Sequence, residues 1–401
     1  MKSPTRKQLD DLWTRHNAQW RDTAQIASQW QEAAETDPKL LEHEVRGSWW
    51  ETIEECGITL LVTREYEHLA MAMCVTDERP RVSYMRLPHP SGLAIDRKRG
   101  IIHVASTRNP NQIFDLAAVG ELLERGDISI DPLAGRPLVP VRSRYFPGCL
   151  YFHDLALVAG ELHGTAVGEN SIVRFRDNGG YDRVWFPRCI ESKAGPVFDR
   201  NLIQLNSVAA GADLSACYFT ASTDQMSRRR PGHRNFPVDR RGVVFSGQTR
   251  EPVARGLTRP HSARLYGKLV GVDNSGYGEF GFVEDGAFRP VMRSTGWTRG
   301  LCFFDNVAFV GTSRVIPRFR HYAPGLDVDA SECGVHAVDL KTGRVLGSLI
   351  WPYGNQVFAV DWAPHTLTTG FPVLAGTKRR ATTEKLLFYA FKHSLMNGGT
   401  R

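Results

Sequence analysis

The chain of 401 residues has few cysteines, and they follow no recognisable pattern. The seven cysteines are odd in number and irregularly spaced, and no two of them form a CxxC pair. Disulfide-stabilised secreted domains usually carry an even, closely spaced set, and thiolate zinc sites need paired cysteines. The sequence therefore argues against a disulfide framework and against a cysteine zinc site.

Long apolar runs are also missing. No run approaches the roughly 18–20 residues that a helix needs to cross a bilayer. The first residues, MKSPTRKQLDDLW, lack the apolar core of a signal peptide. We expect a soluble, cytoplasmic protein with no membrane partner.

Common nucleotide and hydrolase motifs are absent as well. The chain has no GxGxxG after a strand, no phosphate-binding P-loop, no GxSxG and no HExxH. Its composition is that of an ordinary globular protein, with 42% hydrophobic and 23% charged residues and a net charge of +7. This mild basicity permits an anionic partner. Nucleic acid is not expected, because the most arginine-rich stretch, residues 223–241, has Phe236 as its single aromatic residue.

Short strand-like runs repeat along most of the chain. From Ile58 onward, a polar or small residue opens an apolar run, and turn residues follow. Six such units begin at Ser91, His153, Asn206, His261, Arg299 and Gln356. Units of about 40–60 residues fit four antiparallel strands each, which predicts an all-β, six-bladed β-propeller.

The ends of the chain complete this ring. Three strands before Gly92 lack an inner strand, and the last unit, which begins at Gln356, lacks outer strands. We expect these strands to form one blade together, which closes a propeller over residues 46–395. Residues 396–401 form a tail. The runs FPVLAGT and KLLFYAFK are then surplus, and they could instead build a seventh blade.

The N-terminal residues differ from the rest. Within the predicted helical segment 1–45, apolar residues recur at helical spacing from Leu9 to Trp30, with no Gly or Pro between Thr5 and Thr36. One long or two short amphipathic helices are expected. The segment either packs on the ring or serves as a surface for a homo-oligomer or a protein partner.

The first strands of the blades should aim their polar residues at one channel. His153 and His261 form the strongest pair, because two imidazoles in one channel suit proton transfer in both directions. Alternatively, each histidine bonds backbone groups at a blade junction. No cofactor is predicted. A divalent metal on His153 and His261 is the alternative, and Asp154 or Asp273 could help as a third ligand, although Asp154 should point away from His153 if both lie on one strand.

Polar side chains around this pair suit a small anionic ligand. Arg299, Arg314 and Arg264 carry the fixed fork that matches carboxylate or phosphate, and Asn206 and Gln356 could orient the substrate. The arginines could instead bridge neighbouring blades through backbone carbonyls. Two insertions, residues 223–241 and 314–332, should emerge on the same face as binding walls or lids.

Several segments resemble a known family. The segments RPHSARLYGKLVGVDNSGYGE, WTRGLCFFDNVAFVGTSR and CGVHAVDLKTGRV, with their PHS-x-R and TRGL motifs, are similar to a bacterial family of conserved hypothetical, β-propeller-like domains of unknown function. Its members are sometimes fused to tetratricopeptide repeats. The resemblance covers roughly residues 57–362 and implies a propeller fold but no established reaction. Members tend to end soon after the equivalent of QVFAVDW, which favours six blades.

The chain departs from the family pattern at two positions. It has Gln204 where a His-Leu-Asn triplet is expected to begin, and Gln356 where an acidic residue is usual. Our hypothesis is an enzyme that acts on a small anionic metabolite by histidine acid–base chemistry of the isomerase, lyase or hydrolase type, with a biosynthetic role. The alternative is a non-catalytic binding or assembly module that uses the ring face and the N-terminal helix.

Overall fold

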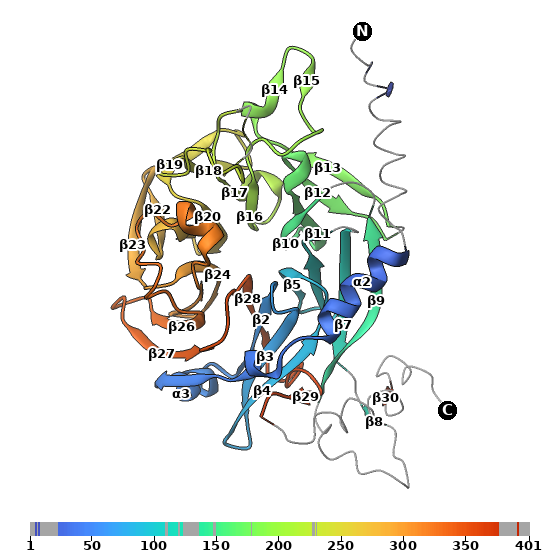
Figure 1. Cartoon of the computed structure of the whole chain (residues 1–401), viewed down its shortest axis with the longest axis vertical. Helices are drawn as coiled ribbons and strands as arrows, with labels where there is room; N and C mark the ends of the chain where they lie inside the picture. Colours follow the sequence, from blue (N-terminus) through green and yellow to red (C-terminus); the bar gives the residue numbers. More distant parts are fainter. Residues whose placement is uncertain are drawn as a thin grey trace.

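The computed structural model describes residues 5, 7–8, 23–108, 111–118, 121–122, 136–146, 150–177, 179–226, 229, 231–376 and 391–392. In these ranges, six antiparallel sheets stand in a ring around a common axis (Figure 1). The predicted all-β, six-bladed propeller is confirmed, and the strands of the described ranges form six rather than seven blades.

The first four blades each contain four strands that follow one another in the chain. Blade 1 consists of β5 (Pro90–Asp96), β6 (Ile101–Ser106), β7 (Asn111–Ala118) and β9 (Leu138–Phe146). Blade 2 consists of β10 (Phe152–Val158), β11 (Glu161–Ala166), β12 (Ser171–Phe175) and β13 (Tyr181–Trp185). Blade 3 consists of β16 (Leu205–Ala209), β17 (Tyr218–Ala221), β18 (Gly242–Ser246) and β19 (Pro252–Leu257). Blade 4 consists of β20 (Pro260–Tyr266), β21 (Leu269–Asn274), β22 (Glu279–Glu284) and β23 (Ala287–Arg293).

The last two blades take strands from the N-terminal part of the chain. Blade 5 consists of β24 (Trp297–Phe304), β25 (Val307–Ser313), β26 (Gly334–Asp339), β27 (Val345–Ile350) and β1 (Glu44–Gly47). Blade 6 consists of β28 (Ala359–Pro364), β2 (Ile58–Arg64), β3 (Leu69–Thr76), β4 (Arg79–Arg86) and β29 (Val373–Leu374). The pairing of β28 with β2 joins the two ends of the ring. The run FPVLAGT supplies β29. Most of KLLFYAFK lies outside the described residues, apart from β30 (Phe391–Lys392), which pairs with β8 (Glu121–Leu122).

The hairpin turns explain why the strands pair in this order. Ala159 and Gly160 connect β10 to β11 with φ of 51° and 79°, and Asp285 and Gly286 connect β22 to β23 with φ of 49° and 78°. Two successive residues with positive φ are typical of the type I′ turn, whose twist matches that of paired strands. These turns keep consecutive strands within one blade.

Between Thr23 and β2, where every residue is described, the chain forms two α-helices. Helix α2 (Thr23–Ala34) confirms part of the predicted N-terminal helical segment, whereas residues 9–22 lie outside the described ranges. The pattern did not indicate β1 or the helix α3 (Trp49–Cys56). Trp49 and Ile53 of α3 are fully buried against blades 5 and 6, and Gly57 ends the helix in the left-handed region with φ of 60°.

The core is divided into clusters between neighbouring blades. Phe280 of blade 4, for example, packs with Leu301 and Val310 of blade 5. The described cysteines are free thiols. No helix in the described ranges is long and apolar enough to cross a lipid bilayer.

The two predicted insertions meet on one face of the ring. Phe236 and Val238 of the first pack against Tyr322 of the second, and the Tyr322 hydroxyl donates to the carbonyl of Gly232 at 3.1 Å. The second insertion also contains the short helix η7 (Pro317–Tyr322). Residues 227, 228 and 230 of the first lie outside the described chain.

Candidate functional site

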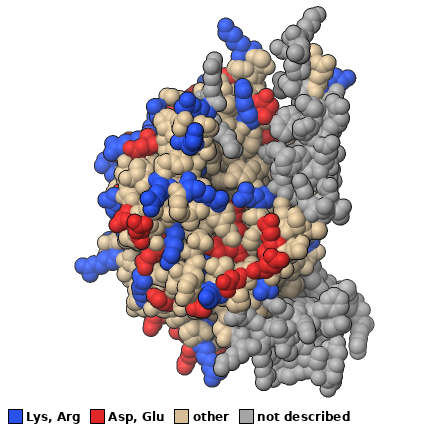
Figure 2. All heavy atoms as spheres, in the orientation of Figure 1, with Lys and Arg blue, Asp and Glu red and all other residues tan. Residues whose placement is uncertain are grey.

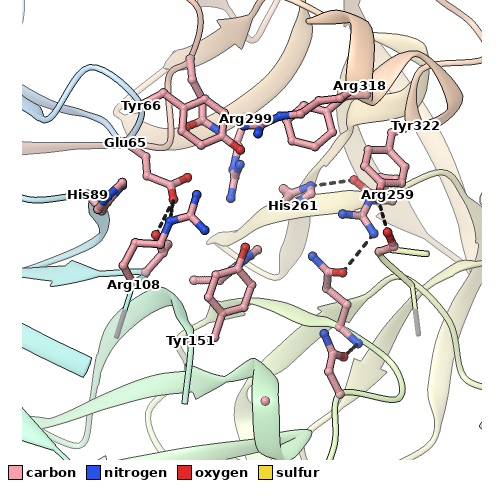
Figure 3. A pocket seen from close by; sticks show the side chains of 18 of the residues that line it. Glu65, Tyr66, His89, Arg108, Tyr151, Arg259, His261, Arg299, Arg318 and Tyr322 are labelled. Carbon is pink, nitrogen blue, oxygen red and sulfur yellow. Dashed lines mark hydrogen bonds and ion pairs between the residues drawn. The ribbon is translucent and has the colours of Figure 1, made fainter. Parts of the chain in front are cut away.

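A cavity of about 1000 Å³ lies on the face where the insertions meet. All six blades, α2 and η7 contribute to its wall. Figure 3 shows lining side chains such as Glu65, Arg299 and Tyr322. Basic and acidic side chains lie close together in the middle of the face seen in Figure 2. The cavity therefore combines charged groups of both signs with residues from distant parts of the chain.

One wall position recurs in four consecutive blades. The residue directly before the innermost strand has positive φ in each, at His89 (45°), Tyr151 (55°), Gln204 (51°) and Arg259 (54°). All four line the cavity. A residue other than glycine in this region is uncommon, and it persists only where the surrounding structure holds it. The blade repeat thus places four different side chains at the same level.

A second recurring feature lies just inside these residues. The innermost strands β5, β10, β16, β20 and β24 each contain a register shift near their start, which is a β-bulge. In β10 the bulge holds His153, whose backbone N–H donates to Thr165 Oγ1 at 3.2 Å. In β16 and β24 it holds Asn206 and Arg299. Bulges re-aim side chains, which explains why these polar groups can leave the strand plane.

The two predicted histidines lie side by side in the cavity wall. The rings of His153 and His261 are nearly parallel, with centroids 6.2 Å apart. His261 Nδ1 lies 2.8 Å from the carbonyl of Arg259, which places the proton on this nitrogen. His261 Nε2 and both ring nitrogens of His153 are buried without a hydrogen-bond partner of good geometry in the described chain.

Burial lowers the pKa of both histidines well below the usual 6.5, and the positive charges of Arg299 and Arg259 lower it further. For His153, the Asn206 side chain offsets a small part of this shift. Both imidazoles are therefore neutral near pH 7. They are better suited to accept or donate hydrogen bonds than to carry a proton as imidazolium.

Glu65 stands opposite the histidines, directly after β2. Burial raises the pKa of its carboxyl group, against the lowering effect of Arg299, Thr107 and Arg108. Thr107 donates a hydrogen bond to Glu65 Oε1, and Arg108 Nε lies 3.9 Å from the same oxygen. Glu65 is thus a carboxyl group that holds its proton to a higher pH than usual, as general acids do.

Gln356 links Glu65 to Arg299. In the amide orientation that suits both neighbours, its nitrogen donates to Glu65 Oε2 at 3.1 Å, and its oxygen accepts from Arg299 Nη1 at 2.9 Å. The backbone N–H of Gln356 donates to Glu67 Oε1 at 3.1 Å, which fixes the residue in place. The guanidinium carbon of Arg299 lies 3.4 Å from the ring centroid of Phe358. Gln356 and Arg299 therefore form one hydrogen-bonded unit with the acid.

Arg259 provides a second buried guanidinium. It donates to Gln204 Oε1 at 3.2 Å and to the carbonyl of Pro231 at 3.4 Å, and it lies over the ring of Tyr322. Burial lowers its pKa to about 10, so it stays charged at neutral pH. The described residues offer it no carboxylate partner within ion-pair distance. A buried cation without a counter-ion favours an anionic ligand.

Three of the predicted site residues lie elsewhere. Arg264 lines a second cavity instead, and it forms a bidentate ion pair with Asp154. Arg314 is exposed and donates to the carbonyl of Pro352. Asn206 lies behind the wall and donates to the carbonyl of Pro260 at 2.9 Å. His153, His261, Arg299 and Gln356 do line the cavity together.

Several lining residues were not singled out, namely Glu65, Tyr66, Tyr151, Arg259 and Trp297, and also Arg318, Phe319 and Tyr322 of the insertion 314–332, which was predicted as a binding wall or lid without naming residues. A signal for the first two exists in the sequence. Thr107 and Arg108 end the second strand of blade 1, and Glu65 and Tyr66 stand at the same place in blade 6. Residues that end the second strand of a blade lie near the channel, and this rule, applied to the N-terminal strands, indicates Glu65 and Tyr66.

The pair His153 and His261, named as the alternative metal site, does not belong to the cluster of possible metal ligands in the described residues. In the described residues, the cluster that could hold an ion is Glu32, His68 and His89, whose ligand atoms lie within 4.8 Å of one another. His68 Nδ1 accepts the backbone N–H of His89 at 3.2 Å, and His89 Nδ1 is buried without an acceptor in the described chain. Ligating histidines usually donate their second N–H to an acceptor. The hydrogen bonding here does not prepare the pair for a cation.

Comparison with known proteins places the chain in a family. Residues 47–370 match the family described as a domain of unknown function (DUF4915). The chain belongs to this family. The DUF4915 match includes the four inner strands of every blade and both insertions, so the cavity is built almost entirely from the shared domain. No curated protein matches the sequence.

Solved structures were also found that are similar to this chain. A chain of the nidogen/laminin complex is 9% identical, with a TM-score of 0.50, and the alignment covers 76% of this chain and 98% of that one. A streptogramin B lyase is 13% identical, with a TM-score of 0.39 and coverage of 73% and 75%. A gluconolactonase from Xanthomonas campestris is 14% identical, with a TM-score of 0.39 and coverage of 66% and 77%. At 9% identity, the likeness to the chain of the nidogen/laminin complex concerns the fold alone.

Proposed function

We propose that this DUF4915 protein is an enzyme that binds a small anionic molecule in the cavity and transfers protons through Glu65. One observation carries the proposal. The cavity wall contains two buried guanidinium groups, and four buried imidazole nitrogens of His89, His153 and His261 in this wall have no partner of good geometry in the described chain. Buried polar groups are normally hydrogen-bonded, so these atoms are arranged for something that enters the cavity.

The charges favour an anion. Arg299 shares its interactions with a network around Glu65, a carboxyl whose pKa is raised, and Arg259 has no carboxylate at hand. Arg318 is exposed at the rim and lies over the rings of Tyr66 and Phe319. Guanidinium groups bind carboxylate and phosphate through paired hydrogen bonds. A ring N–H of neutral His153 can donate to such a ligand, whereas Nε2 of neutral His261 can accept a hydrogen bond from a hydroxyl group of the ligand.

The electrostatics favour Glu65, rather than His153 and His261, as the group that transfers protons. Glu65 is the group whose pKa moves toward neutrality, whereas the pKa values of both histidines move away from it. A protonated Glu65 can donate its proton to an oxygen of the ligand and later recover one from carbon or water. Isomerisation, elimination and hydrolysis all need such a step, and none needs a nucleotide.

A non-catalytic module is the second candidate. A scaffold would separate the two histidines and Arg299 and satisfy each with backbone groups, whereas here all three line one cavity. That arrangement supports a ligand site. The role of the N-terminal helix in an oligomer or with a protein partner stays a prediction, as does a cytoplasmic location.

Anion binding can be tested with a matched pair of variants. Arg318→Ala removes a cavity arginine, and Arg320→Ala removes an exposed arginine two residues away in η7 that does not line the cavity. Titration calorimetry with inorganic phosphate and with malonate should show binding to the wild type, roughly tenfold weaker binding to Arg318→Ala and no change for Arg320→Ala. Equal affinities in all three proteins, or no binding to any, would refute the proposal.

A further inference from the structure

The cavity wall is aromatic as well as charged. Five aromatic residues, Tyr66, Tyr151, Trp297, Phe319 and Tyr322, contribute to it. The rings of Tyr66, Tyr151 and Tyr322 lie around the open centre of the close-up view (Figure 3). Such a wall is unnecessary for an ion as small as phosphate.

From this wall we infer that the anionic ligand carries an aromatic ring, as in an aryl carboxylate or an aryl phosphate. The inference rests on the proposed anion site and adds the chemical class of the ligand. The proposed function concerns the charge of the ligand, whereas this inference concerns the part of the ligand that fills the rest of the cavity.

The cavity is much larger than a phosphate ion. The cavity measures about 1000 Å³, which is in the upper part of the range of 300–1,000 Å³ for pockets that bind drug-sized ligands. Phosphate or a short dicarboxylate fills only a small part of that space. The ligand therefore has a body in addition to the group that the arginines recognise.

The aromatic rings of the wall are grouped around Phe319. Phe319 is central, with its ring centroid 6.3 Å from those of Tyr66 and Trp297 and 5.4 Å from that of Tyr322. Phe319 and Tyr66 are only partly buried although both are large rings, so they keep ring surface toward the cavity. Aromatic pairs prefer offset or edge-to-face contacts, which a third ring can join from the open side.

Two arginines of the wall, Arg318 and Arg299, lie next to aromatic rings. The guanidinium carbon of Arg318 lies 4.9 Å from the ring centroid of Tyr66 and 4.8 Å from that of Phe319. Arg299 lies within 5.8 Å of the ring centroid of Trp297. At two places in the wall, a guanidinium group therefore lies next to an aromatic ring. A ligand whose anionic group is attached directly to a planar ring satisfies both at once.

The hydroxyl groups fit the same ligand. Tyr151 has its pKa raised to about 12, chiefly by burial, so its hydroxyl stays protonated and can donate to the anion. The Tyr322 hydroxyl is already bonded to the carbonyl of Gly232, which leaves its ring rather than its oxygen for the ligand.

The test compares three probes on the full chain by calorimetry, namely inorganic phosphate, methyl phosphate and phenyl phosphate. We expect phenyl phosphate to bind roughly tenfold or more tightly than methyl phosphate. Cyclohexyl phosphate, of similar size, should bind more weakly than phenyl phosphate. If phosphate and methyl phosphate bind and the phenyl group adds nothing, the aromatic inference is wrong while the anion site stands. If no phosphate probe binds, the anion site itself falls.

Variants locate the ring contact. Phe319→Leu and, separately, Tyr66→Leu should lower the ratio of phenyl phosphate affinity to methyl phosphate affinity at least threefold, or about 0.6 kcal/mol, because leucine keeps apolar volume without the ring face. Tyr353→Leu, at an exposed aromatic residue outside the cavity, is the control and should leave the ratio unchanged. The ratio is insensitive to partial unfolding, which weakens both probes equally. An unchanged ratio in both cavity variants would overturn the inference.

Discussion

The ion pair between Arg264 and Asp154 should stabilise the ring where three innermost strands meet. Arg264 Nη1 lies 2.7 Å from Asp154 Oδ2, and Nη2 lies 3.0 Å from Oδ1. Asp154 Oδ2 also accepts the backbone N–H of Val208 at 3.0 Å. The pair therefore connects β10, β16 and β20, and β10 and β20 carry His153 and His261. We predict that it stabilises the ring without touching the ligand.

The expected magnitude follows from burial. The side chains of Arg264 and Asp154 are 18% and 6% exposed. Breaking a buried pair by removing one partner typically costs about 3–5 kcal/mol. In Arg264→Met the Asp154 carboxylate keeps two backbone N–H donors, so we expect the lower end, about 3 kcal/mol. Asp154→Asn should cost about 2 kcal/mol, and the double variant about 3, which leaves a coupling energy of about 2 kcal/mol.

Urea unfolding followed by tryptophan fluorescence measures all four proteins, since the chain has nine tryptophans. Arg97→Met is the matched control, because its pair with Asp361 is more exposed (38% and 19%) and should contribute less than about 1 kcal/mol. Under native conditions, Arg264→Met should bind phosphate as the wild type does. A coupling energy below about 0.5 kcal/mol, or a loss of phosphate binding as large as that of Arg318→Ala, would refute a purely structural role.

Two further predictions concern the cavity itself. Because burial raises the folded-state pKa of Glu65 above its usual 4.5, the folded protein binds more protons than the unfolded chain above about pH 4.5, and stability falls as pH rises through the folded pKa. Glu65→Gln lacks this titration, so its stability relative to the wild type should improve from pH 5 to pH 8 in thermal unfolding; a constant difference would contradict the raised pKa. His153→Phe removes two buried nitrogens without partners of good geometry and should stabilise the fold by about 1 kcal/mol while weakening phosphate binding, and a less stable variant would show that these nitrogens are satisfied.

The sequence predicts the ring and part of the site because both follow from repetition. Short strands with polar first residues recur six times, and equivalent positions in a propeller face the same axis. His153, His261, Arg299 and Gln356 accordingly meet in one cavity, although they are more than 200 residues apart at the extremes. The periodic pattern therefore carries long-range information that single motifs do not.

The same pattern fails where the backbone departs from regular alternation. Arg264 follows the bulge in β20, which shifts the register between His261 and Arg264 and sends the arginine to Asp154. Arg314 follows β25 at the beginning of an insertion, whose path the repeat does not define. Arg318 and Phe319 lie within that insertion, so no equivalent in other blades could indicate their position.

The residues before the innermost strands separate a ligand site from a structural ring. Each has positive φ, which costs a residue with a side chain roughly 1–2 kcal/mol and glycine almost nothing. If the turn alone mattered, glycine or asparagine would serve in all four blades. Instead the positions hold an imidazole, a phenol, an amide and a guanidinium, at His89, Tyr151, Gln204 and Arg259, and all four line the cavity. Four strained and chemically different side chains at equivalent positions are best explained by an asymmetric ligand, because a symmetric frame has no need of them.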